Sequence, residues 1–491
     1  MIDLTIDKNG LAHNIKKARE TGVVIPTIAQ MQRPETIPAK IRERLKGVGL
    51  WDVNPLNLFR ITWKNEPAET GGLFQKAPNY LEIPPELSGV PARIIAMVGK
   101  WFPTGCHKVG ASFGCLAPRL VTGQFDVERH KAVWPSTGNY CRGGAFNSKL
   151  LGAQGVAILP AEMSRERFEW LHSIDAEVIA TPGCESNVKE IFDKTNELRR
   201  DPHYMIFNQF EEMGNPLWHY NVTGNALAEL FEAIKRPEDR FVGACFTSGS
   251  AGTLAAGDRL KELYPQLKLA VGEALQCPTI LTNGYGGHHI EGIGDKHIPW
   301  IHNVRTTDMV IDIDDSDTLH LLRLFNTSKG KAYLRRELGY DDEVIERFTW
   351  LGISGIANIL CCIKMARYYE LGERDVVATV LTDSAEMYQS RIQEMKAELG
   401  PYSERLAFAD HERRLLGQGT ANMAELDYYG RKRVHNLKYY TWVEQQGKTE
   451  RELNALWYDP EGTWDRVHAQ AAELDKLIGA FNDKVGVLAA L

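Results

Sequence analysis

The feature that most constrains the fold is an alternation of short β-rich runs with longer helix-patterned runs, which begins near residue 92. The expected strands are nearly continuous apolar runs, and the stretches between them are long enough for helices. Such strands are typical of a parallel sheet that helices cover on both faces. The strand candidates are residues 92–99, 132–137, 155–161, 176–182, 204–209, 241–249, 268–274 and 376–383. The sequence therefore predicts an α/β fold, doubly wound, in two lobes.

Two flanking segments do not share this alternation. Residues 1–90 are rich in proline and polar turns, whereas residues 393–491 are charged and helical in pattern. We interpret residues 91–392 as a core of two α/β lobes. Residues 1–90 then form an N-terminal extension that packs on the core, and residues 393–491 form a helical C-terminal extension.

The composition argues against several classes of protein. The chain is 43% hydrophobic and 25% charged, which is ordinary for a globular protein, and its net charge of -7 argues against a nucleic-acid partner. The N-terminus lacks the apolar run of a secretory signal. The longest apolar stretch, residues 352–366, is too short and too interrupted to span a bilayer. We therefore expect a cytoplasmic protein with neither a nucleic-acid nor a membrane partner.

Two strand-to-helix junctions carry an amine and a set of hydrogen-bond donors. Ligands of α/β sheets collect at such junctions, beyond the carboxyl ends of the strands. Lys108 follows "TGCH" where a helix would begin, and a helix N-terminus in a partly desolvated pocket favours the neutral amine that attacks a carbonyl. The segment "STGNYCRGG", residues 136–144, offers hydroxyls, an amide and backbone N–H groups to a carboxylate. A solvated lysine and a plain capping turn remain the alternatives.

Two further junctions are rich in small residues. In "TSGSAGT", residues 247–253, small side chains let backbone N–H groups approach a phosphate, although a tight helix entry is the alternative. In "GISGIAN", residues 352–358, a serine faces either a polar ligand atom or its own helix end. An amine, a carboxylate nest, a phosphate cup and an internal hydroxyl are together the parts that hold an amino acid on pyridoxal phosphate.

A histidine-rich loop suggests a different site. "GGHHIEGIGDKH", residues 286–297, contains His288, His289, Glu291, Asp295 and His297. The spacing matches no common zinc helix and the glycines indicate a loop, so we predict no metal site.

Six segments resemble, in family order, the fold type II pyridoxal-phosphate enzymes, which include cysteine synthase and the tryptophan synthase β chain. "TGCHKVGASFG" resembles the cofactor-lysine segment and "STGNYCRGGAFNSKLLGAQGVAILP" the substrate-carboxylate loop. "FNQFEEMGNPLWHYNVTGNALAEL", "FTSGSAGTLAAGDRLKE", "GGHHIEGIGDKHIPWI" and "GISGIANILCCIKMARYYELGERDVVATVLTDSAEMY" follow in the same order. The resemblance covers residues 95–391 and makes the core a cofactor-binding catalytic core.

The resemblance implies roles for individual residues. Lys108 would join pyridoxal 5'-phosphate as an imine and shuttle the α-proton of the substrate. Asn139 would bind the ring hydroxyl and Ser354 would face the ring nitrogen. The phosphate would lie on Gly249, Ser250, Ala251, Gly252 and Thr253, and the substrate carboxylate on Ser136, Thr137, Gly138 and Tyr140 with Gln209 beside it. The bulk of Tyr140 and the charge of Arg142 depart from the family loop.

The resemblance also implies a reaction class. A neutral serine hydroxyl does not keep the ring nitrogen protonated, which favours loss of a β substituent over transamination. We therefore expect β-elimination or β-replacement on a serine- or cysteine-like amino acid, through an aminoacrylate, in a homodimer. The alternatives are an amino-acid dehydratase or ammonia-lyase that releases a 2-oxo acid, and a non-catalytic scaffold or sensor that binds an amino acid.

Overall fold

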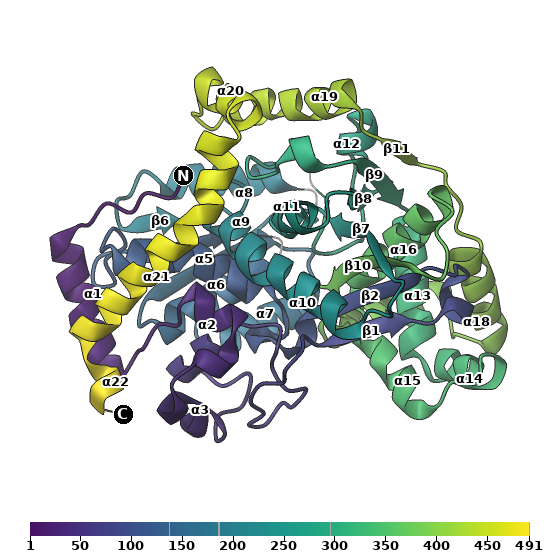
Figure 1. Cartoon of the computed structure of the whole chain (residues 1–491), viewed down its shortest axis with the longest axis horizontal. Helices are drawn as coiled ribbons and strands as arrows, with labels where there is room; N and C mark the ends of the chain where they lie inside the picture. Colours follow the sequence, from purple (N-terminus) through teal and green to yellow (C-terminus); the bar gives the residue numbers. More distant parts are fainter. Residues whose placement is uncertain (137, 185–186, 295, 491) are drawn as a thin grey trace.

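The strands assemble into two sheets in the computed structural model, which describes residues 1–136, 138–184, 187–294 and 296–490 (Figure 1). The large sheet has the order β1-β2-β10-β7-β8-β9-β11 and the small sheet the order β5-β4-β3-β6. The strands are β1 Tyr80–Ile83, β2 Arg93–Val98, β3 Lys131–Pro135, β4 Gln154–Pro160, β5 Glu177–Thr181, β6 Tyr204–Ile206, β7 Arg240–Thr247, β8 Lys268–Ala274, β9 Met309–Ile313, β10 Asp375–Leu381 and β11 Met423–Glu425.

Helices cover the sheets and fill the space between them. The α-helices of the core are α5 Lys108–Val121, α6 Asn139–Leu150, α7 Arg165–Ser173, α8 Val188–Leu198, α9 Gly214–Trp218, α10 Asn225–Ile234, α11 Leu254–Leu263, α12 Thr279–Thr282, α13 Asp315–Asn326, α14 Ser328–Glu337, α15 Asp342–Arg347, α16 Ile353–Tyr368 and α17 Gln389–Leu399. Helix α16 packs on β2, β7, β8, β9 and β10, and its residues from Ile353 to Ala366 are all buried. A helix that is apolar on all sides belongs in such a central position.

Parallel pairing dominates both sheets. Every pair in the small sheet is parallel, as are the pairs that link β2, β10, β7, β8 and β9. The antiparallel strands are the two edges, β1 and β11, which residues 1–90 and 393–491 contribute. The predicted α/β fold with parallel sheets is confirmed, and each expected strand overlaps an observed one. The sequence reasoning missed the short edge strands β1 and β11, and also β9, whose apolar residues stand next to the acidic run Asp312–Asp317.

The two terminal extensions pack against each other. The N-terminal helices are α1 Lys8–Thr21, α2 Ile28–Gln32, α3 Ala39–Leu45 and α4 Pro85–Ser88, and the C-terminal ones are α18 Glu404–His411, α19 Tyr428–Lys438, α20 Glu450–Tyr458, α21 Arg466–Val485 and α22 Val487–Ala490. Helix α21 contacts α1, α2 and α5 (Figure 1). The carboxylate of Asp475 accepts hydrogen bonds from the backbone N–H groups of Ile28 and Ala29, at 2.6 and 3.0 Å. A carboxylate there satisfies N–H groups that the first turn of α2 leaves unpaired.

Among the described residues, no single helix has both the length and the apolar character needed to cross a membrane. One bent pair of segments, Asp342–Trp350 with Ile353–Tyr368, meets those criteria by length and composition alone.

The contact of α21 with the core predicts a pH-dependent stability. The ring of His468 stacks on Tyr220 at 3.7 Å between centroids, and burial lowers the pKa of His468 to about 3. Below the unfolded pKa of about 6.5, the unfolded chain therefore takes up a proton that the folded chain does not, and stability falls as the pH falls. We expect His468→Phe to remove on the order of 1 kcal/mol of this loss at about pH 5.5. Denaturant unfolding of both proteins at two pH values measures the difference, and an unchanged pH dependence contradicts the prediction.

Candidate active site

The amine of Lys108 lies at the start of α5, beyond the carboxyl end of β2. The chain turns between these elements through Thr104 and Gly105, which have φ values of 70° and 66°. Lys108 Nζ donates a hydrogen bond to Gln209 Oε1 at 3.3 Å, although 101 positions separate the two residues. The fold thus brings together two residues that the sequence placed at one site.

The turn after β7 shares a cavity with this lysine. Lys108 lines that cavity together with Gly249, Ser250, Ala251 and Thr253. Ala251 has a φ of 67°, a backbone conformation that residues other than glycine rarely adopt. Helix α11 begins directly after the turn. The N–H groups at a helix N-terminus favour a bound anion. The geometry therefore suits a phosphate placed within reach of an amine.

Asn215 contacts this turn through its side chain. Its Nδ2 donates to Ser250 Oγ at 3.2 Å and to the backbone oxygen of Gln209 at 3.0 Å. A Cβ on Gly252 would lie 2.1 Å from Asn215 Oδ1, so the turn leaves no room for a side chain there. Asn215 lies in a segment that carried the family resemblance, but no local signal marked it as a site residue.

Ser354 supplies a hydroxyl next to Gly292, one of the residues that line the cavity. It lies in the first turn of α16 and is buried, and its Oγ has no hydrogen-bond partner among the described residues. A Cβ on Gly292, which lines the cavity, would be 3.7 Å from this oxygen. Buried hydroxyls normally have a partner, so this one suits a polar ligand atom. With the amine and the anion-binding turn, it fits the donor set that pyridoxal phosphate requires.

Asn139 and the loop before it reach the site from the small sheet through Asp383, the residue after Thr382, which lines the cavity. Gly138 has a φ of 145°, and its N–H donates to Ser136 Oγ at 2.9 Å. Asn139 is the first residue of α6, and its Nδ2 donates to Asp383 Oδ2 at 2.7 Å. The predicted substrate residue Thr137 lies outside the described residues.

The side chain of Tyr140 points away from this loop. Its ring packs edge-on against Trp134 at 5.4 Å, inside the hydrophobic core, and it is fully buried. Burial next to Cys115 raises the pKa of the Tyr140 hydroxyl well above its usual value. Only the backbone N–H of Tyr140 is therefore left to face a substrate carboxylate.

Two buried histidines also line the cavity, and the sequence reasoning did not place them there. The rings of His107 and His219 lie 5.2 Å apart, and Trp63 of the N-terminal extension stacks on His107 at 5.4 Å. Burial lowers the pKa of His107 to about 3 and that of His219 well below its usual value. Both rings are therefore neutral near pH 7. The one feature of the sequence that could have placed His107 at the site is its position next to Lys108.

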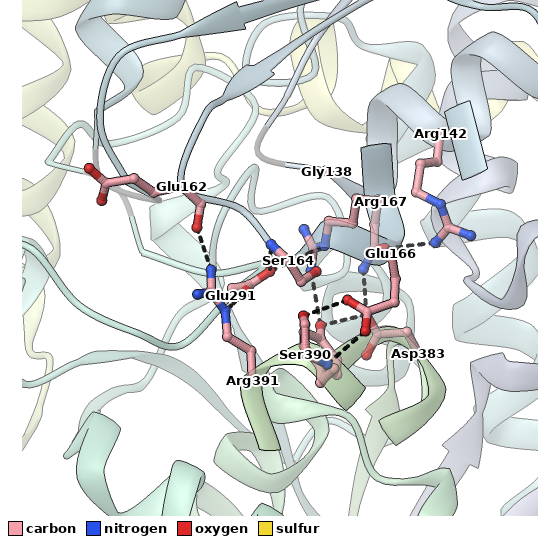
Figure 2. Close-up of polar contacts among 12 residues, drawn as sticks. Gly138, Arg142, Glu162, Ser164, Glu166, Arg167, Glu291, Asp383, Ser390 and Arg391 are labelled. Atoms are coloured by element: carbon pink, nitrogen blue, oxygen red, sulfur yellow. Dashed lines mark hydrogen bonds and ion pairs between the residues drawn. The ribbon is translucent and has the colours of Figure 1, made fainter. Parts of the chain in front are cut away.

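The histidine-rich loop is part of an ion-pair network instead. Glu291 Oε1 accepts from Arg391 Nε at 2.6 Å, and its Oε2 lies 3.3 Å from Arg167 Nε (Figure 2). Burial lowers the pKa of His288 to about 4. Within the part of the chain that the structure describes, which omits Asp295, no group of three His, Cys, Asp or Glu side chains is placed to hold a metal ion.

Comparison with known proteins identifies the family. A profile described as "Pyridoxal-phosphate dependent enzyme" matches residues 102–332. A cysteine synthase of Staphylococcus aureus is 30% identical over 259 residues, which are 52% of this chain and 75% of that protein. A cystathionine beta-synthase of Apis mellifera is 28% identical over 206 residues, 40% of each chain. The chain belongs to the family of pyridoxal-phosphate-dependent enzymes, and its cofactor is pyridoxal 5'-phosphate.

Solved structures share the fold. A cysteine synthase from Entamoeba histolytica aligns with a TM-score of 0.55 at 19% identity, covering 69% of this chain and 93% of that one. The O-acetylserine dependent cystathionine beta-synthase from Helicobacter pylori aligns with a TM-score of 0.53 at 22% identity, covering 64% and 95%. The expected fold type II architecture is confirmed.

The tight packing around Gly252 gives a direct test of whether the turn of residues 249–253 binds the phosphate. We expect Gly252→Ala to lower cofactor affinity about tenfold, or about 1.4 kcal/mol, because the new Cβ displaces Asn215 from Ser250. Titration of the apoenzyme with pyridoxal phosphate measures the dissociation constant. Gly479→Ala in α21, where no atom lies within 4 Å of the added Cβ, is the matched control and should bind normally. Equal affinities in the two variants would contradict the assignment of the turn.

Proposed function

We propose that this enzyme catalyses β-elimination or β-replacement on a serine- or cysteine-like amino acid. The observation that carries the proposal is that the amine of Lys108 and the turn of residues 249–253 line one cavity. The relatives named cysteine synthase and cystathionine beta-synthase support this reaction class. The contact between Lys108 and Gln209 supports a substrate bound beside the amine.

Each site residue has a proposed role in this reaction. Lys108 would hold the cofactor covalently through Nζ, and the same nitrogen would remove the α-proton of the substrate. Gly249, Ser250, Ala251, Gly252 and Thr253 would hold the phosphate, Asn139 the ring oxygen and Ser354 the ring nitrogen. Ser136, Thr137, Gly138, the backbone of Tyr140, and Gln209 would orient the substrate carboxylate. Pyridoxal phosphate supplies an electron sink for the substrate's α-carbon.

Ser354 bears on the choice of reaction. Its neutral hydroxyl donates or accepts a hydrogen bond but does not stabilise a protonated ring nitrogen as a carboxylate would. The electron sink that the cofactor would supply is then weaker, which favours the loss of a β substituent from the substrate. This supports β chemistry over transamination.

Borohydride reduction of the holoenzyme tests the attachment site. We expect the reduced cofactor on the peptide that contains Lys108, detected by mass spectrometry, and none on Lys108→Ala. The variant should also lose turnover by on the order of 10³-fold, because one nitrogen serves as both nucleophile and base. A label on another lysine, or no label on the holoenzyme, overturns the proposed site.

A panel of β-substituted amino acids, each with and without an added thiol, tests the reaction class. A new thioether or thiol product supports β-replacement, and a 2-oxo acid with ammonia supports elimination, the outcome also expected of a dehydratase or ammonia-lyase. Binding without turnover of any compound contradicts the proposal and favours a non-catalytic amino-acid sensor.

We also propose a homodimer located in the cytoplasm. The dimer rests on the resemblance to the family, and the location rests on the similarity to the cysteine synthases. Sedimentation of the purified protein, which has a chain mass of 55.2 kDa, distinguishes a dimer from a monomer.

A further inference from the structure

A buried carboxylate lies directly behind Asn139. Asp383 follows β10 and is fully buried, and its Oδ2 accepts two hydrogen bonds of 2.7 Å, from Asn139 Nδ2 and from the Tyr388 hydroxyl. On the other side, a Cβ on Gly352 would lie 1.9 Å from Asp383 Oδ1, so the carboxylate has no room to turn. None of the roles implied by the family resemblance uses this residue.

The two groups around the Asn139 amide fix its orientation. A carboxylate only accepts hydrogen bonds and a guanidinium only donates them. Asn139 Nδ2 faces Asp383, and Asn139 Oδ1 faces Arg142 Nη1 at 3.5 Å. If the amide were reversed, its oxygen would face the carboxylate of Asp383 and its NH₂ group would face the guanidinium of Arg142. Both contacts would be repulsive. One Nδ2 hydrogen is bonded to Asp383, and the other remains for a ligand.

A second tether holds the carboxylate in place. Tyr388 donates to Asp383 and its oxygen accepts from Arg167 Nη2 at 3.0 Å. The Arg167 guanidinium lies under the substrate loop, where a Cβ on Gly138 would be 1.9 Å from Nη1. Figure 2 shows Arg167 and Asp383 in one polar cluster with Glu291 and Arg391. The amide of Asn139 and the loop before it are therefore braced by the same network.

The ionisation of Asp383 depends on its neighbours. Burial raises its pKa above the ordinary value, and Arg167, the two hydrogen bonds and Arg142 oppose this rise only in part. The experiments below are therefore run at about pH 8, well above the ordinary range of a carboxyl group.

We propose that Asp383 is a positioning residue that sets the Asn139 amide so that Nδ2 donates to the oxygen on the cofactor ring. The inference rests on the proposed role of Asn139 in the preceding section. It assigns to Asp383 an effect on the cofactor that acts only through Asn139.

A double-mutant cycle separates this role from general support of the fold. Asp383→Ala, Asn139→Ala and the double variant are compared by the dissociation constant of pyridoxal phosphate and by the wavelength of the bound-cofactor absorbance band. We expect about a tenfold weaker affinity in each single variant, with the band shifted in the same direction. The double variant should match Asn139→Ala, because Asp383 has nothing left to orient. If the affinity losses of the two single variants multiply in the double variant, the inference is overturned.

Three further measurements sharpen the result. Asp383→Asn retains an oxygen that accepts from Asn139 and should recover most of the affinity, whereas a loss equal to that of Asp383→Ala counts against the proposal. Tyr388→Phe removes one of the two hydrogen bonds to Asp383 Oδ2 but leaves the contact between Asp383 and Asn139. It should therefore weaken the affinity less than Asp383→Ala does, and an equal loss counts against the proposal. If thermal unfolding shows that Asp383→Ala is not folded, Asp383→Ser replaces it in the cycle.

The outcomes also distinguish this inference from the proposed function. Should borohydride leave Lys108 of the wild-type protein unlabelled, the proposed function fails. Should Lys108 carry the cofactor while the cycle is multiplicative, only the role of Asp383 fails.

Discussion

The shared direction of neighbouring strands is the constraint on which the site depends. Strands β2, β10 and β7 are adjacent and parallel, so their carboxyl ends lie at one edge of the large sheet. Lys108 follows β2, Asp383 follows β10 and the proposed phosphate turn, residues 249–253, follows β7. The small sheet contributes the end of β3, which carries Asn139 to the same place. Parallel pairing thus assembles an amine, a carboxylate, an anion cup and an amide from segments far apart in the chain.

The two terminal extensions are integral to this arrangement. Each adds an edge strand to the large sheet, and they pack on each other through Asp475 and the start of α2. Trp63 from the N-terminal extension stacks on His107, the neighbour of the proposed catalytic lysine, and donates a hydrogen bond to Thr223 at 3.1 Å. A buried aromatic ring there helps to keep water away from His107, and burial lowers the pKa of that histidine and keeps it neutral.

Much of the fold could be predicted because its signals are local. Apolar runs such as β2 and β10 are buried along their whole length, which is what continuous hydrophobicity predicts for strands covered on both faces. The signal failed for β9, where Asp312 interrupts the apolar run and acidic residues follow it. The family resemblance supplied the roles of Lys108 and Ser354, whose surroundings in the structure suit those roles. It supplied no role for Asp383.

The sequence by itself determined the alternation of strands and helices, the parallel architecture and the small-residue junctions at which a ligand would bind. These follow from periodicity and from backbone space, which nearby residues control. Only the tertiary structure decided which way the side chains at those junctions point. The ring of Tyr140 turns into the core, where it packs next to Trp134 and Cys115. The amide of Asn139 turns toward Asp383 because it donates a hydrogen bond of 2.7 Å to that carboxylate, although the two residues are 244 positions apart in the chain. Such orientations depend on contacts between distant segments, and no local pattern encodes them.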